Sequence, residues 1–380
     1  MDAYLKTPGT FCFSPWASID ISASGIIKPC CKFTDSTYNI NDHTISEFRN
    51  SPMIGDIKHK FLKGVQPTEC FRCWKEESTG IQSKRQLDYS RWHNEYSSYN
   101  LYDSKLLVLS VAVSNICNLK CRICNAKNST KWRKEEVTYT NTEIQYQPYL
   151  KNPNVINELR SLMNNIIHID FHGGEPLLPK NNDHIEIIQY LVNNNYANEV
   201  TLHYVTNGTI YPTPDLIELW QDFNHIDIQI SLDGIKDHFE YNRFPANWDT
   251  TYINIKEFQS LADTTDNVQL NISHTLSIFT VYYLPEFINW CISEELTMPW
   301  VGRLNKPDYY QPGIVPLKSK HIVYDKLSSH HLPQVTDWQS EVFINDASEY
   351  LPIFGEWITK VDNYRNQSFT KTFPELAALL

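Results

Sequence analysis

Three cysteines stand within eight residues of this chain, in the segment C-N-L-K-C-R-I-C. Cys117, Cys121 and Cys124 have the spacing C-x3-C-x2-C, and the next cysteine in the sequence is Cys291. Thiolates bind zinc and iron–sulfur clusters, and structural sites of this kind usually close with four protein ligands. A set of three leaves one metal position open, as in a catalytic metal site. The alternatives are a zinc site that borrows a distant histidine, or a coincidence of spacing.

A second group of cysteines lies nearer the start of the chain. Four of its members follow the patterns C-x12-G-x4-C and C-x2-C, namely Cys12, Cys30, Cys70 and Cys73. Alternating apolar and polar residues around Gly25 predict a hairpin, and a helix is expected between Ser51 and Gly64. A hairpin, a helix and a C-x2-C turn can bring four sulfurs together as a closed metal site. From residue types alone, zinc is the leading candidate for this site.

The elements that must position the three-cysteine loop follow an alternating pattern. Apolar strands are expected over residues 105–113, 165–172, 199–206, 225–232 and 267–276, with a weaker strand over 297–304. Helical patterns lie between them, for example over residues 183–193, 215–223 and 284–295. This alternation predicts a parallel sheet, closed or partly closed as a barrel. Six strand–helix units are two fewer than a full eight-fold barrel contains.

Polar motifs follow the ends of these expected strands. G-G-E-P follows the second strand, Asn207 the third and Ser231 lies at the end of the fourth. In parallel barrels the carboxyl ends of the strands meet at one edge, where catalytic groups gather. Gly173 and Gly174 allow close approach of the backbone to a ligand. We therefore expect a ligand site that combines these motifs with the three cysteines.

With these motifs, the sequence resembles a radical S-adenosylmethionine (SAM) enzyme over roughly residues 105–305. The resemblance implies that the three-cysteine loop holds a [4Fe–4S] cluster, whose open iron binds the amino and carboxylate groups of SAM. It also implies reductive cleavage of SAM to a 5′-deoxyadenosyl radical, which abstracts a hydrogen atom from the substrate. Ile123 differs from the aromatic residue that many relatives have beside the last cysteine, although an aliphatic side chain can still pack on adenine.

The resemblance also assigns ligand contacts to individual residues. Glu175 can accept a charge-assisted hydrogen bond from the methionyl ammonium, and Pro176 stiffens the end of the turn. Asn207 and Ser231 are placed to bind ribose or carboxylate, and Arg243 resembles the arginine that pairs with the SAM carboxylate. Each of these last three residues can also be read as an ordinary surface or capping residue.

The N-terminal cysteine group resembles the twitch domain of radical SAM enzymes, a shortened relative of the SPASM domain. The resemblance implies an auxiliary [4Fe–4S] cluster at Cys12, Cys30, Cys70 and Cys73, with Cys31 as a spare thiol and zinc as the alternative metal. In many relatives this module follows the barrel, whereas here it precedes it. The expected fold is therefore α/β: a partial (β/α)6 TIM-like barrel preceded by a small cysteine-rich twitch domain of a β-hairpin and a helix. We expect domains at residues 1–100, 101–310 and 311–380.

Composition limits the function further. The chain has 380 residues and a net charge of −11, which disfavours broad binding to nucleic acid. No apolar run suggests a secretory signal or a membrane span, so we expect a cytoplasmic protein. In that compartment its nine cysteines are expected to be metal or catalytic ligands rather than disulfides.

Three functions follow from these patterns. The first is an enzyme that modifies a peptide or protein, in which the auxiliary cluster accepts an electron or positions the substrate. Such an enzyme needs an external one-electron reductant such as flavodoxin or ferredoxin. The second is a dehydrogenase of a small molecule, such as a sugar or amino-sugar alcohol. The third is a non-catalytic iron–sulfur or zinc scaffold, in which the G-G-E-P motif would have no purpose. The sequence identifies no catalytic acid, base or hydrogen-atom donor.

Overall fold

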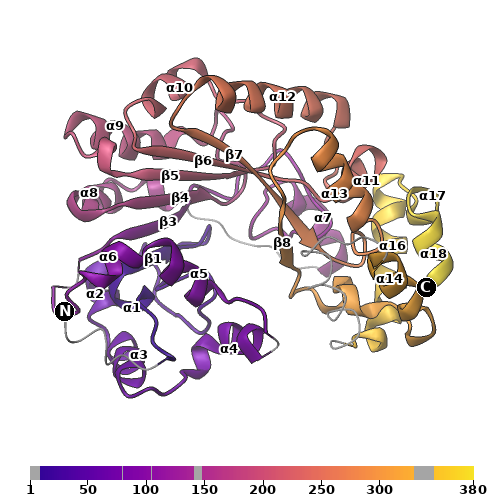
Figure 1. Ribbon diagram of the computed structural model, residues 1–380, viewed down its shortest axis with the longest axis horizontal. Coiled ribbons are helices and arrows are strands. Elements are labelled where there is room, and N and C mark those ends of the chain that lie inside the picture. Colours follow the sequence, from indigo (N-terminus) through magenta and orange to yellow (C-terminus); the bar gives the residue numbers. More distant parts are fainter. Residues whose placement is uncertain (1–8, 79, 104, 141–147, 329–345) are drawn as a thin grey trace. The chain divides into compact units, whose positions relative to one another are not determined.

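The structure is a computed structural model that describes residues 9–78, 80–103, 105–140, 148–328 and 346–380. Its strands form an eight-stranded sheet in the order β2-β1-β3-β4-β5-β6-β7-β8 (Figure 1). The chain divides into two compact units, each described by itself below. The first unit comprises Met1–Ile116, Ile144–Tyr204 and Thr213–Ile226, and the second comprises Cys117–Glu143, Val205–Pro212 and Asp227–Leu380. Among the described residues, no helix has the length and apolar character needed to cross a membrane.

The first unit begins with the N-terminal hairpin and continues into parallel strands. Its strands are β1 (Ser18–Ile21), β2 (Ile27–Lys28), β3 (Val108–Ala112), β4 (His168–His172) and most of β5 (Thr201–Thr206). Its helices are α1 (Ser14–Ala17), α2 (Ile45–Arg49), α3 (Pro52–Leu62), α4 (Phe71–Ser78), α5 (Lys84–Arg91), α6 (His93–Ser97), α8 (Pro153–Leu162), α9 (Ile185–Asn193) and α10 (Pro214–Trp220). As expected, Ser51 caps the N-terminus of α3, where its hydroxyl accepts a hydrogen bond from Ile54 N.

The predicted hairpin around Gly25 is present, but it also belongs to the main sheet. Gly25 has a φ of +81°, and a Cβ there would lie 2.6 Å from Asn39 Oδ1, so glycine is required at this turn. Strand β2 pairs antiparallel with β1, and β1 pairs parallel with β3. The six strands expected from residue 105 onward are confirmed, and the hairpin adds two more to the same sheet.

The parallel strands of the first unit have one apolar face and one polar face. Ile169, Phe171, Leu202 and Tyr204 are fully buried on the apolar face. The rings of Phe171 and Tyr204 contact His184 before α9 and Trp220 of α10, with centroids 4.8 and 5.1 Å apart, respectively. Because side chains alternate along a strand, the residues between them face the other way. Parallel sheets are usually apolar on both faces, so the polar face calls for a functional explanation.

The second unit contains the remaining strands and the C-terminal helices. Its elements are most of β6 (His225–Ser231), β7 (Val268–Leu276), β8 (Trp300–Arg303), α7 (Trp132–Thr140), α11 (Lys236–Asn242), α12 (Trp248–Thr264), α13 (Leu284–Ser293), α14 (Leu317–Ser328), α16 (Leu351–Arg365), α17 (Phe369–Thr372) and α18 (Pro374–Leu379). Its apolar core joins residues of β7 to the C-terminal helices, for example Leu276 to Phe354 and Phe373. The C-terminal segment is therefore part of this core. Cys291 is fully buried in the same unit.

His184 makes the stability of the first unit sensitive to acid. Its imidazole is 1% exposed, and burial lowers its pKa from 6.5 to about 4. The unfolded chain takes up a proton at its ordinary pKa, whereas the folded chain resists protonation down to about pH 4. The free energy of unfolding should therefore fall by up to about 3 kcal/mol as pH drops from 6.5 to 4.

We expect His184→Asn to flatten this part of the pH profile, measured by urea denaturation. The Asn amide can still donate to Asn181 O, as His184 Nδ1 does at 2.7 Å. His321→Asn, an exposed change on α14, serves as the control and should keep the wild-type slope. Identical slopes for wild type and His184→Asn would contradict the assignment.

Candidate functional site

The cysteine loop, defined here as residues 117–124, follows β3 and has no helix or strand of its own. Thr130 Oγ1 accepts a hydrogen bond from Cys117 N at 3.4 Å, and Cys121 O accepts one from Cys124 N at 3.0 Å. Burial raises the pKa of the Cys124 thiol, and the charges of Cys121 and Cys117 raise it further. The three thiols are thus close enough to interact electrostatically, and their predicted role as ligands of one metal cluster stays a prediction.

Two backbone hydrogen bonds attach the cysteine loop to residues 242–244. Lys120 N and Arg122 N donate to carbonyls of this segment at 2.7 and 2.8 Å. Arg243 lies between the two acceptors, is 8% exposed and forms an ion pair of 2.8 Å with Asp233. The structure therefore places Arg243 beside the loop. Its predicted pairing with the SAM carboxylate stays a prediction.

Three other predicted SAM-contacting residues belong to the second unit. Asn207 Nδ2 lies 3.9 Å from Cys117 Sγ, next to the cysteine loop. Ser231 Oγ, at the end of β6, accepts a hydrogen bond from Ser273 Oγ at 3.3 Å. Ile123 is partly buried and packs against the apolar core of the unit. Asn207 therefore lies beside Cys117, whereas Ser231 and Ile123 contact other residues of the protein. The predicted contacts of all three residues with SAM stay predictions.

The G-G-E-P turn, residues 173–176, belongs to the first unit and packs against Ile116, the residue before the cysteine loop. Gly173 has a φ of +82°, and a Cβ on Gly174 would lie only 2.1 Å from Ile116 O. The same carbonyl accepts a hydrogen bond from Glu175 N at 3.0 Å. Both glycines are therefore required for close backbone packing beside the start of the loop.

Two buried polar side chains lie near this turn. Glu175 is 0% exposed, and its carboxylate accepts a hydrogen bond from Leu177 N at 3.1 Å. Asn115 is 1% exposed, and neither atom of its amide has a hydrogen-bond partner among the described residues. Buried amides nearly always have partners, so Asn115 is suited to contact a polar ligand. Sequence reasoning missed Asn115, because nothing in its neighbourhood of the sequence marks it.

A small cavity of the first unit brings together the four predicted N-terminal ligands. This four-cysteine cavity is lined by Cys12, Cys30, Cys70 and Cys73 together with Phe33, Phe61, Trp74 and several cationic side chains. Burial raises the pKa of Cys12 to about 11, and the charge of Cys73 adds to the rise. Cys31 is not among the lining residues, and its expected role as a spare thiol stays a prediction.

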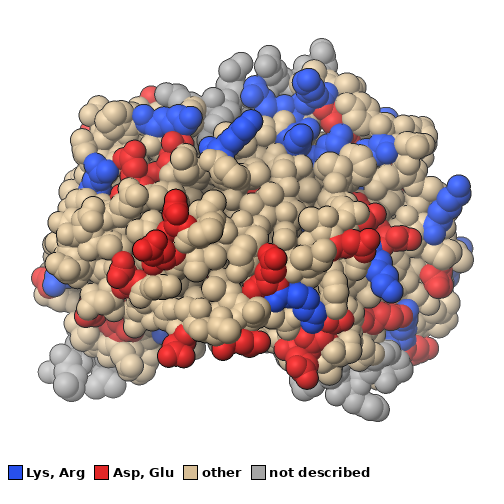
Figure 2. All heavy atoms as spheres, turned by 90° about the horizontal axis from the view of Figure 1, so that it is seen from above, with Lys and Arg blue, Asp and Glu red and all other residues tan. Residues whose placement is uncertain are grey.

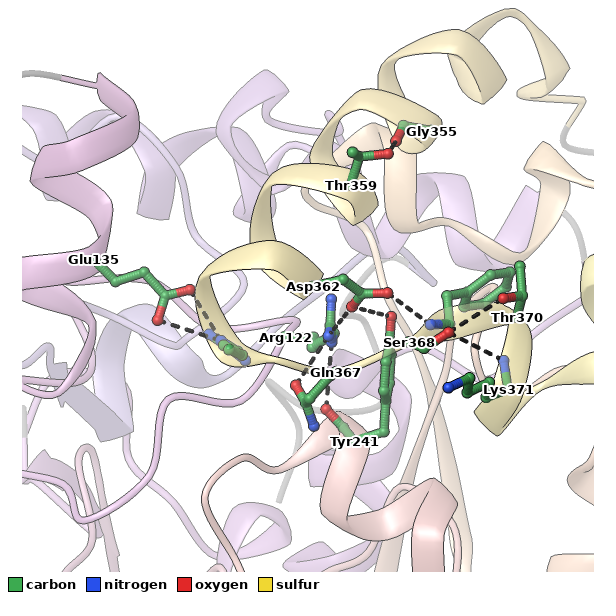
Figure 3. A network of polar contacts seen from close by, with 12 residues as sticks. Arg122, Glu135, Tyr241, Gly355, Thr359, Asp362, Gln367, Ser368, Thr370 and Lys371 are labelled. Carbon is green, nitrogen blue, oxygen red and sulfur yellow. Dashed lines mark hydrogen bonds and ion pairs between the residues drawn. The ribbon is translucent and has the colours of Figure 1, made fainter.

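A buried polar network ties the cysteine loop to α16 (Figure 3). Arg122 is 2% exposed and donates to Asp362 of this helix and to Gln367 just after it. Its guanidinium lies 3.6 Å from the ring centroid of Tyr241, whose hydroxyl also donates to Asp362 at 2.9 Å. The C-terminal segment thus holds a residue of the C-R-I-C motif in place.

A second ion-pair cluster joins α7 to the same end of α16. Arg365 Nε lies 2.9 Å from Glu135 Oε1, and both side chains are 0% exposed. Lys120 of the cysteine loop also pairs with Glu135, at 2.6 Å. The guanidinium of Arg365 lies 4.5 Å from the ring centroid of Trp132. Buried charges are stable only when paired, so this cluster fixes the loop against two helices.

Comparison with known proteins supports the expected class of the domain. Residues 111–268, which include the cysteine loop, match the Radical SAM superfamily. This confirms the resemblance carried by the C-x3-C-x2-C motif and supports the assignment of the protein as an enzyme. No curated protein matches the chain.

Two solved structures show low similarity to the chain. Native anSMEcpe with bound AdoMet and Cp18Cys peptide is 17% identical, with 58% of each chain covered and a TM-score of 0.41. Streptococcus suis SuiB is 14% identical, with 86% of this chain and 70% of SuiB covered and a TM-score of 0.38. The match thus spans less than two thirds of the anSMEcpe chain.

Gly174→Ala should displace the start of the cysteine loop. The new Cβ would lie 2.1 Å from a backbone oxygen, which cannot move without shifting Ile116 and the cysteine that follows it. We expect a loss of about 1–3 kcal/mol in stability and of iron bound per chain. Gly55→Ala is the matched control, because a Cβ at this helical position meets nothing within 4 Å. Wild-type iron content and unfolding midpoint in Gly174→Ala would contradict the prediction.

Arg122→Met should destabilise the second unit, because it leaves the carboxylate of Asp362 buried without its cation. The expected cost is about 3–5 kcal/mol, measured by urea denaturation, with weaker retention of iron. The double variant Arg122→Met/Asp362→Leu should recover part of this loss, since it removes both charges. Lys360→Met changes an exposed residue of the same helix and serves as the control. Equal stability of Arg122→Met and Lys360→Met would refute the role of the network.

Proposed function

We propose that this chain is a radical SAM enzyme that modifies a peptide or protein with the help of a second, auxiliary [4Fe–4S] cluster. The grouping of four cysteines around one cavity of the first unit carries the proposal. The cysteine loop supplies a separate set of three thiols, within the residues that match the Radical SAM superfamily. The three thiols of the cysteine loop leave one metal position open, whereas the four thiols of the cavity are enough for a complete set of protein ligands.

The residues of the chain fit the groups that this function requires. When bound, the first cluster and SAM supply reductive cleavage to a 5′-deoxyadenosyl radical, the species that abstracts a hydrogen atom. The three thiols of the cysteine loop would hold that cluster. The unpaired amide of Asn115 offers polar contacts for SAM, and the glycines at 173 and 174 let backbone approach it. Arg243 and Asn207 offer a charge and an amide beside the thiols.

The resemblance of the N-terminal cysteine group to the twitch domain supports an iron–sulfur cluster over zinc in the four-cysteine cavity. Four thiols are enough to ligate either group. An auxiliary cluster there would accept an electron or position the substrate.

Charge supports a neutral or basic peptide as the substrate. The chain carries 44 acidic and 33 basic residues. Figure 2 shows one face of the molecule, on which acidic side chains are spread in several groups and basic ones gather mainly along one margin. Electrostatic attraction of this kind favours positively charged partners. An external one-electron reductant such as flavodoxin or ferredoxin would complete the reaction.

A small-molecule dehydrogenase is the second candidate function. Its support is the polar face of the sheet, where Asp170 and His203 lie on neighbouring strands. Carboxylate and imidazole groups can bind the hydroxyls of a sugar or amino-sugar alcohol.

Iron and sulfide analysis of anaerobically reconstituted protein tests both clusters. We expect about eight irons per chain in the wild type and about four after Cys30→Ala, because a cluster of four irons is lost. Cys31→Ala, beside it in the sequence but outside the cavity lining, should keep the wild-type content. About four irons per chain in the wild type, with or without zinc, would contradict the proposed auxiliary cluster.

Reductant-dependent formation of 5′-deoxyadenosine tests the proposed catalysis. Cys121→Ala should abolish it, whereas Cys291→Ala, a buried change outside both thiol sets, should leave it intact. Absence of 5′-deoxyadenosine from the wild type would favour a non-catalytic scaffold. Mass spectrometry after incubation with peptide pools and with free sugars then separates the two substrate classes. Conversion of a sugar but of no peptide would favour the small-molecule dehydrogenase over the peptide-modifying enzyme.

A further inference from the structure

A row of polar side chains crosses four parallel strands of the first unit. Asp20 of β1 is in register with Ser110 of β3, Ser110 with Asp170 of β4, and Asp170 with His203 of β5. Residues in register on parallel strands point to the same face of the sheet. His168 lies two residues before Asp170 and therefore shares this face. The cysteine-ligand sites described above use none of these side chains.

Three atoms of this face converge on one point. His168 Nε2 lies 2.9 Å from Asp170 Oδ1, and His203 Nδ1 lies 2.7 Å from the same oxygen. All three atoms lie within 4.8 Å of one another. Two imidazoles from neighbouring strands thus aim a ring nitrogen at a single carboxylate oxygen. Among the described residues, no other His, Cys, Asp or Glu side chains form such a group.

The surroundings hold the three side chains in place. The ring of Trp92 packs against His168 with centroids 5.4 Å apart. Strand positions are rigid, and rigid ligands favour metal binding because little freedom is lost on binding.

The cations near this group are paired with carboxylates, which reduces their repulsion of a divalent metal ion. Lys84 of α5 interacts electrostatically with Asp170, but its ammonium lies 2.8 Å from each carboxylate oxygen of Asp88, which offsets its charge. Asp20 lies two strands away on the same face, is 3% exposed and has an Oδ2 without a hydrogen-bond partner. Lys28 Nζ lies 3.7 Å from Asp20 Oδ1, and His172 Nε2 lies 3.7 Å from Asp20 Oδ2. Lys84 and Lys28 are thus each paired with a carboxylate.

We propose that His168, Asp170 and His203 form a binding site for a first-row divalent metal ion, separate from both thiol sites. Imidazole nitrogen suits zinc and iron(II), and two histidines with one carboxylate are a recurrent ligand set for both. Three protein ligands leave coordination positions open, which is typical of catalytic metal sites. An open position can take a carboxylate, hydroxyl or thiolate group of a ligand. Asp20 and His172, on the same face, would make further polar contacts to it.

Zinc binding to the intact enzyme tests this site. Clusters are first reconstituted so that the thiols are occupied, and adventitious metal is removed with a weak chelator. Equilibrium dialysis against Zn²⁺ should then give about one equivalent per chain in the wild type. Asp170→Ala and His203→Ala each remove one ligand atom and should weaken binding by more than about 100-fold. His321→Gln, an exposed change on α14, should bind as the wild type does.

Each outcome has a defined meaning. Loss of the bound zinc in both ligand variants, with unchanged iron content and circular dichroism, supports the site. Equal zinc in the wild type and all variants, or no zinc in the wild type, overturns the proposal and leaves a hydrogen-bonded carboxylate–histidine cluster. Because zinc content and iron content are measured separately, failure of this site is distinguishable from failure of the proposed clusters.

Discussion

The cysteine loop depends on buried charge pairs, because an irregular segment cannot hold three thiols in place by itself. Two of its residues, Arg122 and Lys120, reach carboxylates at Asp362 and Glu135. A buried cation without its partner is strongly destabilising, so the loop is stable only when α16 and α7 are folded against it. The C-terminal segment is therefore a structural part of the unit that holds the cysteine loop, although it lies outside the residues that match the superfamily.

The cysteine loop is also held at its start, where the G-G-E-P turn packs closely against the residue that precedes the loop. Ile116 O accepts hydrogen bonds from Glu175 N and from Asn181 Nδ2. A carbonyl with two donors is fixed in direction, and the chain that leaves it is fixed as well. Gly174 permits this arrangement because no Cβ intervenes. The turn thus has a packing role in the first unit, in addition to the ligand role expected from the resemblance.

Local patterns in the sequence predict much of this fold. The six strands from residue 105 onward, the cap at Ser51 and the turn at Gly25 all depend on neighbouring residues, and all were found. The pair between Arg122 and Asp362 joins residues 240 positions apart, so no local pattern marks it. The His168–Asp170–His203 group likewise depends on the register of β4 with β5, which periodicity cannot supply. Arg243 was predicted to pair with the SAM carboxylate, whereas its position beside the loop and its partner Asp233 emerged only from the fold.

Both thiol sites place fixed cations next to buried sulfur. Burial raises the pKa of Cys121 and Cys30, whereas Arg243 acts against that rise at the first and Lys84 at the second. Each cation is held by a carboxylate, at 2.8 Å in both the Arg243–Asp233 and the Lys84–Asp88 pairs. The anchoring carboxylate fixes each cation in position but also offsets part of its charge, and the pKa of both thiols stays raised. The two thiol groups thus share one arrangement, a buried sulfur next to a paired cation, which unrelated segments of the chain provide.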